Sequence, residues 1–326
     1  MISPYYCFSI ADEADFRSHA LTVFRHQAAN VKVYSEFLRA IGVDPSSVNC
    51  WEDIPYLPIE LFKTHRVIDR EGPVTLEFRS SGTTGQDVSR HAVADPRLYD
   101  TSFLRAFERF YGHPSGYCFL ALLPSYLERE GSSLVYMTEK LIRLSGHQDS
   151  GFYLYDHASL AAVMRKLTEA GQPVILLGVT YALIDLAQTF PGTYPGLIVM
   201  ETGGMKGRRK EITREELQKE LCSLLGVERI HSEYGMTELF SQAYSSGDGR
   251  FQCPPWMRVR IREADDPFSQ APAGRTGGIN ITDLANYHSC SFIATQDLGR
   301  DLGQGTFEVM GRFDDADVRG CNLMAP

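Results

Sequence analysis

Short apolar segments alternate with helical patterns from residue 74 to residue 250, and this alternation constrains the fold more than any other feature of the chain. Strands are expected at 74–78, 88–93, 117–122, 173–179, 196–200 and 227–230. Helices are expected at 97–111, 132–145, 158–170, 180–189 and 213–225. This order of elements predicts an α/β architecture in which helices flank largely buried strands.

The segments on either side have different patterns. Near the N-terminus, apolar residues recur on one face of a helix that begins after a capping Asp12, and a second helical stretch ends at Gly42. After residue 251 the chain is rich in turns, and strands are expected at 256–261, 278–281, 291–295 and 306–310. We therefore expect an N-terminal helical region at 1–73, an α/β core at 74–250, and a smaller β subdomain with a C-terminal tail at 251–326.

Composition limits the classes of function. The 326 residues carry a formal net charge of −9, so there is no overall basic footprint of the kind that neutralises nucleic-acid phosphates. The seven cysteines include no Cys-x-x-Cys pair, which indicates reduced thiols and neither a zinc knuckle nor a disulfide framework. The N-terminus has no secretory pattern and the apolar runs are of strand length, so we expect a cytoplasmic protein without a membrane span.

A run of serine, threonine and glycine, Arg79-Ser-Ser-Gly-Thr-Thr-Gly85, lies between two expected strands. Glycines allow positive φ angles and bring backbone N–H groups close to an anion, and the hydroxyl side chains add donors for phosphate oxygens. The run lacks the Gly-Lys-Ser/Thr of a Walker A loop. Phosphate binding is one interpretation, and a solvated hairpin loop is the other, because the same residue types are common in turns.

A second segment, Ser232-Glu-Tyr-Gly-Met-Thr-Glu238, follows the strand expected at 227–230. The face of Tyr234 is suited to stacking on a purine, Thr237 to donating to a phosphate, and Glu238 to binding magnesium through hard oxygen atoms. The alternative is an ordinary strand-to-helix turn with an acidic residue near the start of the helix.

The third segment, Thr295-Gln-Asp-Leu-Gly-Arg300, is followed by Gly311-Arg-Phe-Asp-Asp315. A fixed carboxylate such as that of Asp297 suits the two hydroxyls of a ribose, and Arg300 offers a forked donor for a phosphate. The alternative is a pair of polar β-turns with an ordinary surface ion pair.

Together and in this order, the segments resemble the adenylate-forming superfamily, which includes acyl-CoA synthetases, firefly-type luciferases and peptide-synthetase adenylation domains. The resemblance over residues 79–320 implies ATP and Mg²⁺ as cofactors, with Thr237 on the α-phosphate and Glu238 on the metal. It implies nucleotide contacts from Ser80, Ser81, Gly82, Thr83, Thr84, Gly85, Glu201, Thr202, Gly203, Gly204, Tyr234, Gly235, Asp297, Arg300 and Arg312. The implied reaction is the in-line attack of a carboxylate on the α-phosphorus, for which positioning and charge neutralisation dominate.

The chain departs from this superfamily in two places. The phosphate loop is followed by Gln86-Asp-Val-Ser-Arg90, where many members have Pro-Lys. The sequence ends at Pro326, whereas a typical member continues for roughly another hundred residues as a lid domain that carries a catalytic lysine. We therefore expect the large domain of the superfamily without that lid.

Such an end is similar to the acyl-protein synthetases of bacterial luminescence systems, which activate a fatty acid and move the acyl group onto one of their own cysteines. The segments that carry this resemblance are Pro124-Ser-Tyr-Leu-Glu-Arg129, Ser132-Ser-Leu-Val-Tyr-Met137, Thr202-Gly-Gly-Met-Lys206 and Asp317-Val-Arg-Gly-Cys-Asn-Leu323. The resemblance implies that Cys321 is a catalytic nucleophile, a role that suits a thiolate on a terminal tail. An inert Cys321 is the alternative.

Three functions are open from the sequence. The first is an acyl-protein synthetase that passes the acyl group through Cys321 to an acyl-CoA reductase-like, thioesterase-like or carrier-protein partner. The second is a ligase that hands acyl-AMP directly to CoA, an amine or a carrier protein, and the third is a non-catalytic nucleotide-binding protein. The acid is fatty by resemblance only, the oligomeric state is open, and His231 either lines an acyl pocket or is structural.

Overall fold

The computed structural model describes residues 3–69, 74–80, 88–124, 131–203 and 214–313. The helices are α1 (Glu13–Asn30), α2 (Lys32–Ala40), α3 (Leu61–Thr64), α4 (Pro96–Tyr111), α5 (Ser133–Ser145), α6 (His157–Glu169), α7 (Thr180–Thr189) and α8 (Arg214–Leu225), with short 3₁₀ helices at Pro4–Ser9, Pro45–Ser47, Trp51–Asp53 and Pro114–Gly116. The strands are β1 (Leu57–Pro58), β2 (Leu76–Arg79), β3 (Arg90–Val93), β4 (Cys118–Leu122), β5 (Gly151–Phe152), β6 (Val174–Val179), β7 (Leu197–Thr202), β8 (Ile230–Tyr234), β9 (Ala243–Ser245), β10 (Arg250–Gln252), β11 (Met257–Arg262), β12 (Thr276–Asp283), β13 (Phe292–Gly303) and β14 (Thr306–Arg312).

The helices begin and end at local signals that the sequence carries. Asp12 caps α1, because its carboxylate accepts a hydrogen bond from the backbone N–H of Asp15 at 2.9 Å. Helix α4 begins with Pro96 in its first turn and ends at Gly112, whose φ of 82° is open to glycine without strain. In the described part of the chain, no helix is both long and apolar enough to cross a bilayer.

Within the described residues, twelve strands form one sheet in the order β11-β12-β13-β14-β10-β9-β8-β7-β6-β4-β5, with β1 beside β13. Strands β5, β4, β6, β7 and β8 are parallel, and the sheet becomes antiparallel where β9 pairs with β8. Strands β2 and β3 form a separate antiparallel hairpin. The parallel half is the part that positions the candidate site, because ligands in such sheets bind at the carboxyl ends of the strands.

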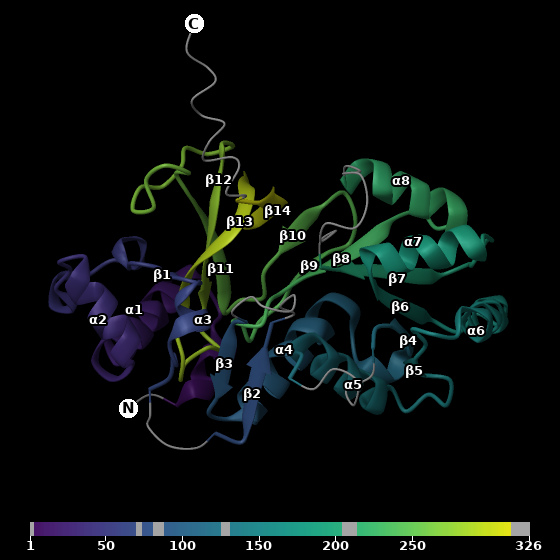
Figure 1. Ribbon diagram of the computed structural model, residues 1–326, viewed down its shortest axis with the longest axis horizontal. Coiled ribbons are helices and arrows are strands. Elements are labelled where there is room, and N and C mark those ends of the chain that lie inside the picture. The colour runs from purple at the N-terminus through teal and green to yellow at the C-terminus, as the bar shows by residue number, and fades with distance from the viewer. Residues whose placement is uncertain (1–2, 70–73, 81–87, 125–130, 204–213, 314–326) are drawn as a thin grey trace, which may run out of the picture.

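Helices cover both faces of the parallel half (Figure 1). Alternate residues of a strand point to opposite faces, so Val199 and Ile230 pack with α6, α7 and α8. Phe119 and Met200 point the other way and pack in the core cluster that includes α4 and α5. Two apolar layers therefore enclose the strands, as the alternating pattern predicts.

The antiparallel half continues the same sheet, because β14 pairs with β10. The N-terminal region lies against it: β1 pairs with β13 in parallel, and the buried amide of Gln27 in α1 donates to the backbone oxygens of Asn286 at 3.0 Å and Tyr287 at 2.9 Å. The expected division at residues 73 and 250 stays a prediction.

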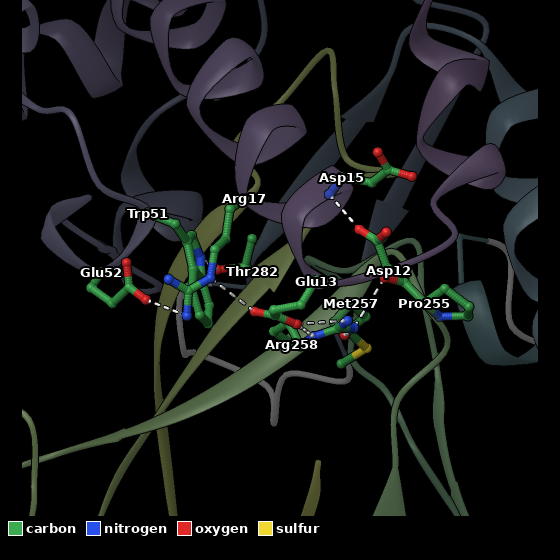
Figure 2. A network of polar contacts seen from close by, with 10 residues as sticks. All are labelled: Asp12, Glu13, Asp15, Arg17, Trp51, Glu52, Pro255, Met257, Arg258 and Thr282. Carbon is green, nitrogen blue, oxygen red and sulfur yellow. Dashed lines mark hydrogen bonds and ion pairs between the residues drawn. The ribbon is translucent and has the colours of Figure 1, made fainter. Parts of the chain in front are cut away.

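Figure 2 shows how α1 is tied to this half of the molecule. Arg258 on β11 forms an ion pair with Glu13 at 3.2 Å, and Arg17 pairs with Glu52 at 2.8 Å. The buried Trp51 donates through Nε1 to the Thr282 hydroxyl at 3.1 Å. Exposed ion pairs contribute little, so the burial of Trp51 is the main stabilising contribution here.

Strands β1, β5, β9 and β10 were not predicted, and two of the predicted strands, β8 and β13, differ most from their expected positions. Strand β8 occupies Ile230–Tyr234, where 227–230 was expected, because the positive φ of Gly226 ends the preceding helix and residues 227–229 only lead into the strand. Strand β13 runs to Gly303, so Asp297 and Arg300 lie within a long strand and the interpretation of this segment as a β-turn is wrong. Its polar residues are held in extended form by pairing with β12 and β14 on both sides.

Candidate active site

The carboxyl ends of β6, β7 and β8 meet at one edge of the sheet, and the second sequence motif leaves from this edge. Tyr234 is the last residue of β8, and the backbone beyond it turns back toward β9. The backbone carbonyl oxygen of Thr237 contacts Nδ1 of the buried His91 at 2.9 Å. The backbone carbonyl oxygen of Glu238 accepts a hydrogen bond from the Asn286 side chain at 2.7 Å. The motif is therefore held in place from both β3 and the segment after β12.

The side chain of Glu238 is a buried carboxyl with 5% exposure. Burial raises its pKa, while the Ser89 hydroxyl and the more distant Arg312 favour the charged form. Ser89 also closes the base of the phosphate-loop candidate, since its N–H donates to the Ser80 hydroxyl at 3.0 Å and its oxygen accepts from Ser80 N at 3.0 Å. Ser89 thus brings the first and second motifs together.

The other residues of that loop, Ser81, Gly82, Thr83, Thr84 and Gly85, lie outside the described residues, and so do Gly204 and Cys321. Their predicted roles stay predictions.

Tyr234 joins the second motif to the third. Its hydroxyl donates to Oδ2 of Asp297 at 2.8 Å, and Arg312 lies 3.2 Å from Oδ1 of the same carboxylate. Burial and the nearby Asp297 charge raise the pKa of the Tyr234 phenol well above its ordinary value, so it stays a donor. The ring packs edge-on against Phe251 and Phe307, and stacking on a purine stays a prediction.

Arg300 is engaged elsewhere. Its guanidinium donates to Glu308 on β14 at 2.7 Å, in an ion pair that is partly exposed to solvent. The structure therefore joins Asp297 and Arg312 directly, while Arg300 would have to exchange or extend its pairing with Glu308 to bind a phosphate.

The residues at the end of β7 point to both faces of the sheet. The Glu201 carboxylate accepts from Ser232 at 3.1 Å and from Thr180 at 3.4 Å on the side of α7. The next residue, Thr202, points to the side of α4 and donates to Glu233 at 2.5 Å. Gly203 follows with a φ of 70°, which marks the sharp departure of the chain from the strand. Glu201 and Thr202 therefore belong to opposite sides of the candidate site.

Glu233 is a site residue for which the sequence analysis proposed no role. It is 7% exposed, and burial raises the pKa of its carboxyl to about 7. A larger residue at position 235 would collide with Glu233, because a Cβ at Gly235 would lie 2.6 Å from Oε1 of Glu233. The strand was expected to end at residue 230, so the sequence carried no signal for a buried carboxyl at this position.

His231 lies on the same face of β8 as Glu233, two residues closer to the start of the strand. Its Nδ1 contacts the Tyr111 hydroxyl at 3.1 Å, and burial lowers its pKa. It lines a cavity of about 830 Å³ together with Tyr111, Tyr244, Asp248 and Arg250. This cavity lies toward the amino ends of β7 and β8, so His231 is distant along the strand from the Glu238 segment.

The chemistry of Glu238 fits a magnesium ion with few protein ligands. No group of three or more His, Cys, Asp or Glu side chains suited to a metal occurs in the described part of the chain. Magnesium commonly keeps several waters and binds one or two carboxylates together with substrate phosphates. A single buried carboxylate beside the base of the phosphate-loop candidate meets that requirement.

The α/β prediction is confirmed by the mixed sheet and by the similarity of the fold to solved structures. A crystal structure of 2-hydroxyisobutyryl-CoA ligase with 2-HIB-AMP and CoA matches 93% of this chain and 70% of its own, with a TM-score of 0.69 and 16% identity. The same ligase in its postadenylation state gives a TM-score of 0.67 at 14% identity, over 93% of this chain and 68% of the ligase.

ATP-bound MatB from Rhodopseudomonas palustris gives a TM-score of 0.54 at 18% identity. The match covers 75% of this chain and 49% of MatB, so the chain spans about half the length of that protein. No protein-family model and no curated protein matches the sequence. At these identities the likeness is one of fold.

Proposed function

We propose that the protein activates a carboxylic acid with ATP, forming acyl-AMP and releasing pyrophosphate. The observation that supports this most strongly is the convergence of three distant segments at one sheet edge. Ser89 links Ser80 to Glu238, and Tyr234 links the same motif to Asp297. A solvated hairpin and an isolated surface turn would have no reason to share these buried contacts.

The motif residues that the structure describes have the following parts in this reaction. Asp297, held by Tyr234 and Arg312, accepts the ribose hydroxyls of ATP through its carboxylate. Thr237 contacts the α-phosphate, and its position is set by the bond between its carbonyl and His91. An oxygen of the acid attacks the α-phosphorus, a new P–O bond forms, the bond to the β-phosphate oxygen breaks, and pyrophosphate leaves.

Glu238 holds Mg²⁺ in this scheme. The ion supplies neutralisation of phosphate charge when bound. The chain contributes a buried carboxylate that is oriented by Ser89 and by the Asn286 bond to the Glu238 carbonyl. This fixed position requires no rearrangement of the protein during the reaction, which is the advantage of a preorganised site.

The test of adenylation is the incorporation of labelled pyrophosphate into ATP in the presence of magnesium and a panel of carboxylic acids. Incorporation that depends on an acid supports the proposal. Nucleotide binding without exchange for any acid favours the non-catalytic alternative and rejects the enzyme. Glu228→Gln, at an exposed position that precedes β8, serves as a control that should exchange like the wild type.

For the second step we propose transfer to Cys321, on the strength of the resemblance to acyl-protein synthetases. The thiolate attacks the acyl carbonyl, a C–S bond forms, the bond to the AMP oxygen breaks, and AMP leaves. The thioester then passes to a reductase-like, thioesterase-like or carrier-protein partner. Intact-protein mass spectrometry after incubation with ATP, magnesium and acid should show an acyl adduct that is lost in Cys321→Ala. An adduct that persists in this variant rejects the role of Cys321.

Direct transfer to CoA is the second candidate, since the similar solved structures include a CoA ligase with CoA in its complex. The two candidates differ in the product. Acyl-CoA formed by Cys321→Ala at the wild-type rate supports direct transfer, whereas an adduct on Cys321 that forms without CoA supports the acyl-protein route.

A further inference from the structure

Glu233 lies on the side of the sheet that faces α4, at the edge where the proposed reaction takes place. The pairing of β8 places it between Thr202 on β7 and Tyr244 on β9. Oε2 of Glu233 accepts from the Thr202 hydroxyl at 2.5 Å. Among the described residues, Oε1 has no hydrogen-bond partner. One carboxylate oxygen is therefore fixed, and the other is available for a donor.

Two further polar groups lie on this face without partners. The amide oxygen of Gln242 and the hydroxyl of Tyr244 are buried and have no hydrogen bond within the described part of the chain. Gln242 and Glu233 approach the same point, because a Cβ on Gly235 would lie 3.4 Å from Cγ of Gln242 and 2.6 Å from Oε1 of Glu233. Buried polar groups in proteins nearly always have partners, so a cluster of three on one face calls for a specific reason.

No cation among the described residues balances the Glu233 carboxylate. Its pKa is set by burial, which raises it to about 7, and by the Thr202 bond, which acts in the opposite direction. The surrounding groups are the phenols of Tyr99, Tyr111 and Tyr244, and the Glu233 charge raises the pKa of each of them. A buried carboxyl in such surroundings is costly unless a hydrogen-bond donor or a positive charge reaches it.

We propose that the activated acid carries a hydrogen-bond donor, an amino or hydroxyl group, which Glu233 and Gln242 accept while the carboxylate of the acid faces the Thr237–Glu238 segment. This inference rests on the proposed adenylation and specifies the substrate class of that same site. An ammonium group supplies three donors and the missing positive charge, so it is the strongest match, and a hydroxyl supplies one donor. An unsubstituted alkyl acid leaves the acceptor oxygens without partners.

The experiment compares matched acids in the pyrophosphate exchange assay. For each of several chain lengths, an ω-amino acid, the ω-hydroxy acid and the unsubstituted acid are assayed with the wild type, Glu233→Gln and Glu233→Leu. Sites built to hydrogen-bond a group discriminate strongly against the analogue without it. At the best chain length, we expect kcat/KM of the wild type to be about tenfold or more higher for a donor-bearing acid.

The variants separate recognition from structural damage. Glu233→Leu should reduce the preference at least tenfold, because it lowers kcat/KM for the donor-bearing acid more than for the unsubstituted acid. Glu233→Gln keeps an acceptor and removes the charge, so it should lose preference for the amino acid more than for the hydroxy acid. Glu139→Gln on α5 makes the same chemical change at a partly exposed position, where Glu139 pairs with Arg143, and should leave all ratios unchanged.

The outcomes distinguish this inference from the function on which it rests. If no acid supports exchange, the adenylation proposal fails and this inference fails with it. If the wild type has equal kcat/KM for unsubstituted and donor-bearing acids, and Glu233→Leu leaves the ratio of these two values unchanged, adenylation stands and the inference is overturned. Should Glu233→Leu not fold, the wild-type panel and Glu233→Gln still decide the question.

Discussion

The Tyr234 hydroxyl donates a hydrogen bond to Asp297 across 63 residues of sequence, at 2.8 Å. The bond joins the last residue of the parallel strand β8 to the middle of the antiparallel strand β13. Because Tyr234 stands at the switch between the two halves of the sheet, this contact places a carboxylate from one half beside a motif from the other. Ligand sites of open α/β sheets commonly lie at the carboxyl ends of the parallel strands, where Tyr234 lies.

Asp297→Asn should weaken ATP binding about tenfold to a hundredfold, because an amide is a poorer acceptor for ribose hydroxyls than a charged carboxylate. Calorimetric titration with ATP and magnesium measures the change. Asp301→Asn on the same strand is the matched control, since Asp301 bonds only to the local Gly303 N–H in the described structure and should bind ATP normally. Equal affinity in Asp297→Asn and the wild type would contradict the ribose assignment.

Glu238→Gln should lower the exchange rate about a hundredfold and shift its magnesium dependence to higher concentration, because an amide is a weak ligand for a hard cation. The fold should survive, since burial already raises the pKa of this carboxyl and a neutral side chain suits the position. Magnesium titration of exchange, together with thermal unfolding, checks both parts. A titration curve that coincides with that of the wild type would remove Glu238 from the metal site.

Glu233 should make stability fall as the pH rises. Its pKa is raised by burial from an ordinary 4.5 to about 7, so its folded-state stabilisation is fully present below pH 4.5 and is lost as the pH rises through 7. Relative to Glu233→Gln, the wild type should lose about 3 kcal/mol of unfolding free energy over this range. Denaturant unfolding at several pH values measures the difference, and parallel curves would show that the carboxyl is not buried as described.

His91 should have the opposite effect. Burial lowers the pKa of this imidazole from 6.5 to about 4, so its contribution is present above pH 6.5 and is lost as the pH falls through 4. His91→Phe keeps an aromatic ring between Phe62 and Phe240 and cannot titrate. The wild type should lose about 3 kcal/mol relative to this variant on acidification, measured by the same unfolding experiment.

The two slopes oppose each other, so the wild type itself should have a nearly flat profile from these two groups between pH 4.5 and pH 6.5. Each single variant should reveal the slope of the remaining group. A steep wild-type profile with no change in either variant would assign acid sensitivity to other side chains.

Local signals explain what the sequence predicted well. The expected boundaries of helices α4 to α7 lie within a residue or so of the observed ones. Capping residues such as Asp95 and helix-ending glycines such as Gly112 act within one turn, so they can be read from the local sequence. The three motifs were identified from residue type and order alone. Their meeting at Ser89 and Tyr234 could be expected only through the family resemblance, since the bonds that join them span long separations in the chain.

Tertiary pairing explains what the sequence did not predict. Asp297 and Arg300 interrupt the apolar pattern of β13, and the strand persists because β12 and β14 pair with it on both sides. The role of Glu233 could not be found because β8 was expected to end before it, and because its partner Thr202 lies 31 residues away. The continuity of the sheet through β10 and β14 likewise depends on pairing that leaves no local pattern.

The most direct test of the account uses an acid whose carboxylate carries isotopically heavy oxygen, incubated with the protein, ATP and magnesium and trapped with hydroxylamine. Attack of the carboxylate on the α-phosphorus leaves one heavy oxygen on AMP, and the account predicts labelled AMP together with unlabelled pyrophosphate. Unlabelled AMP, or ADP and labelled phosphate in its place, would contradict it.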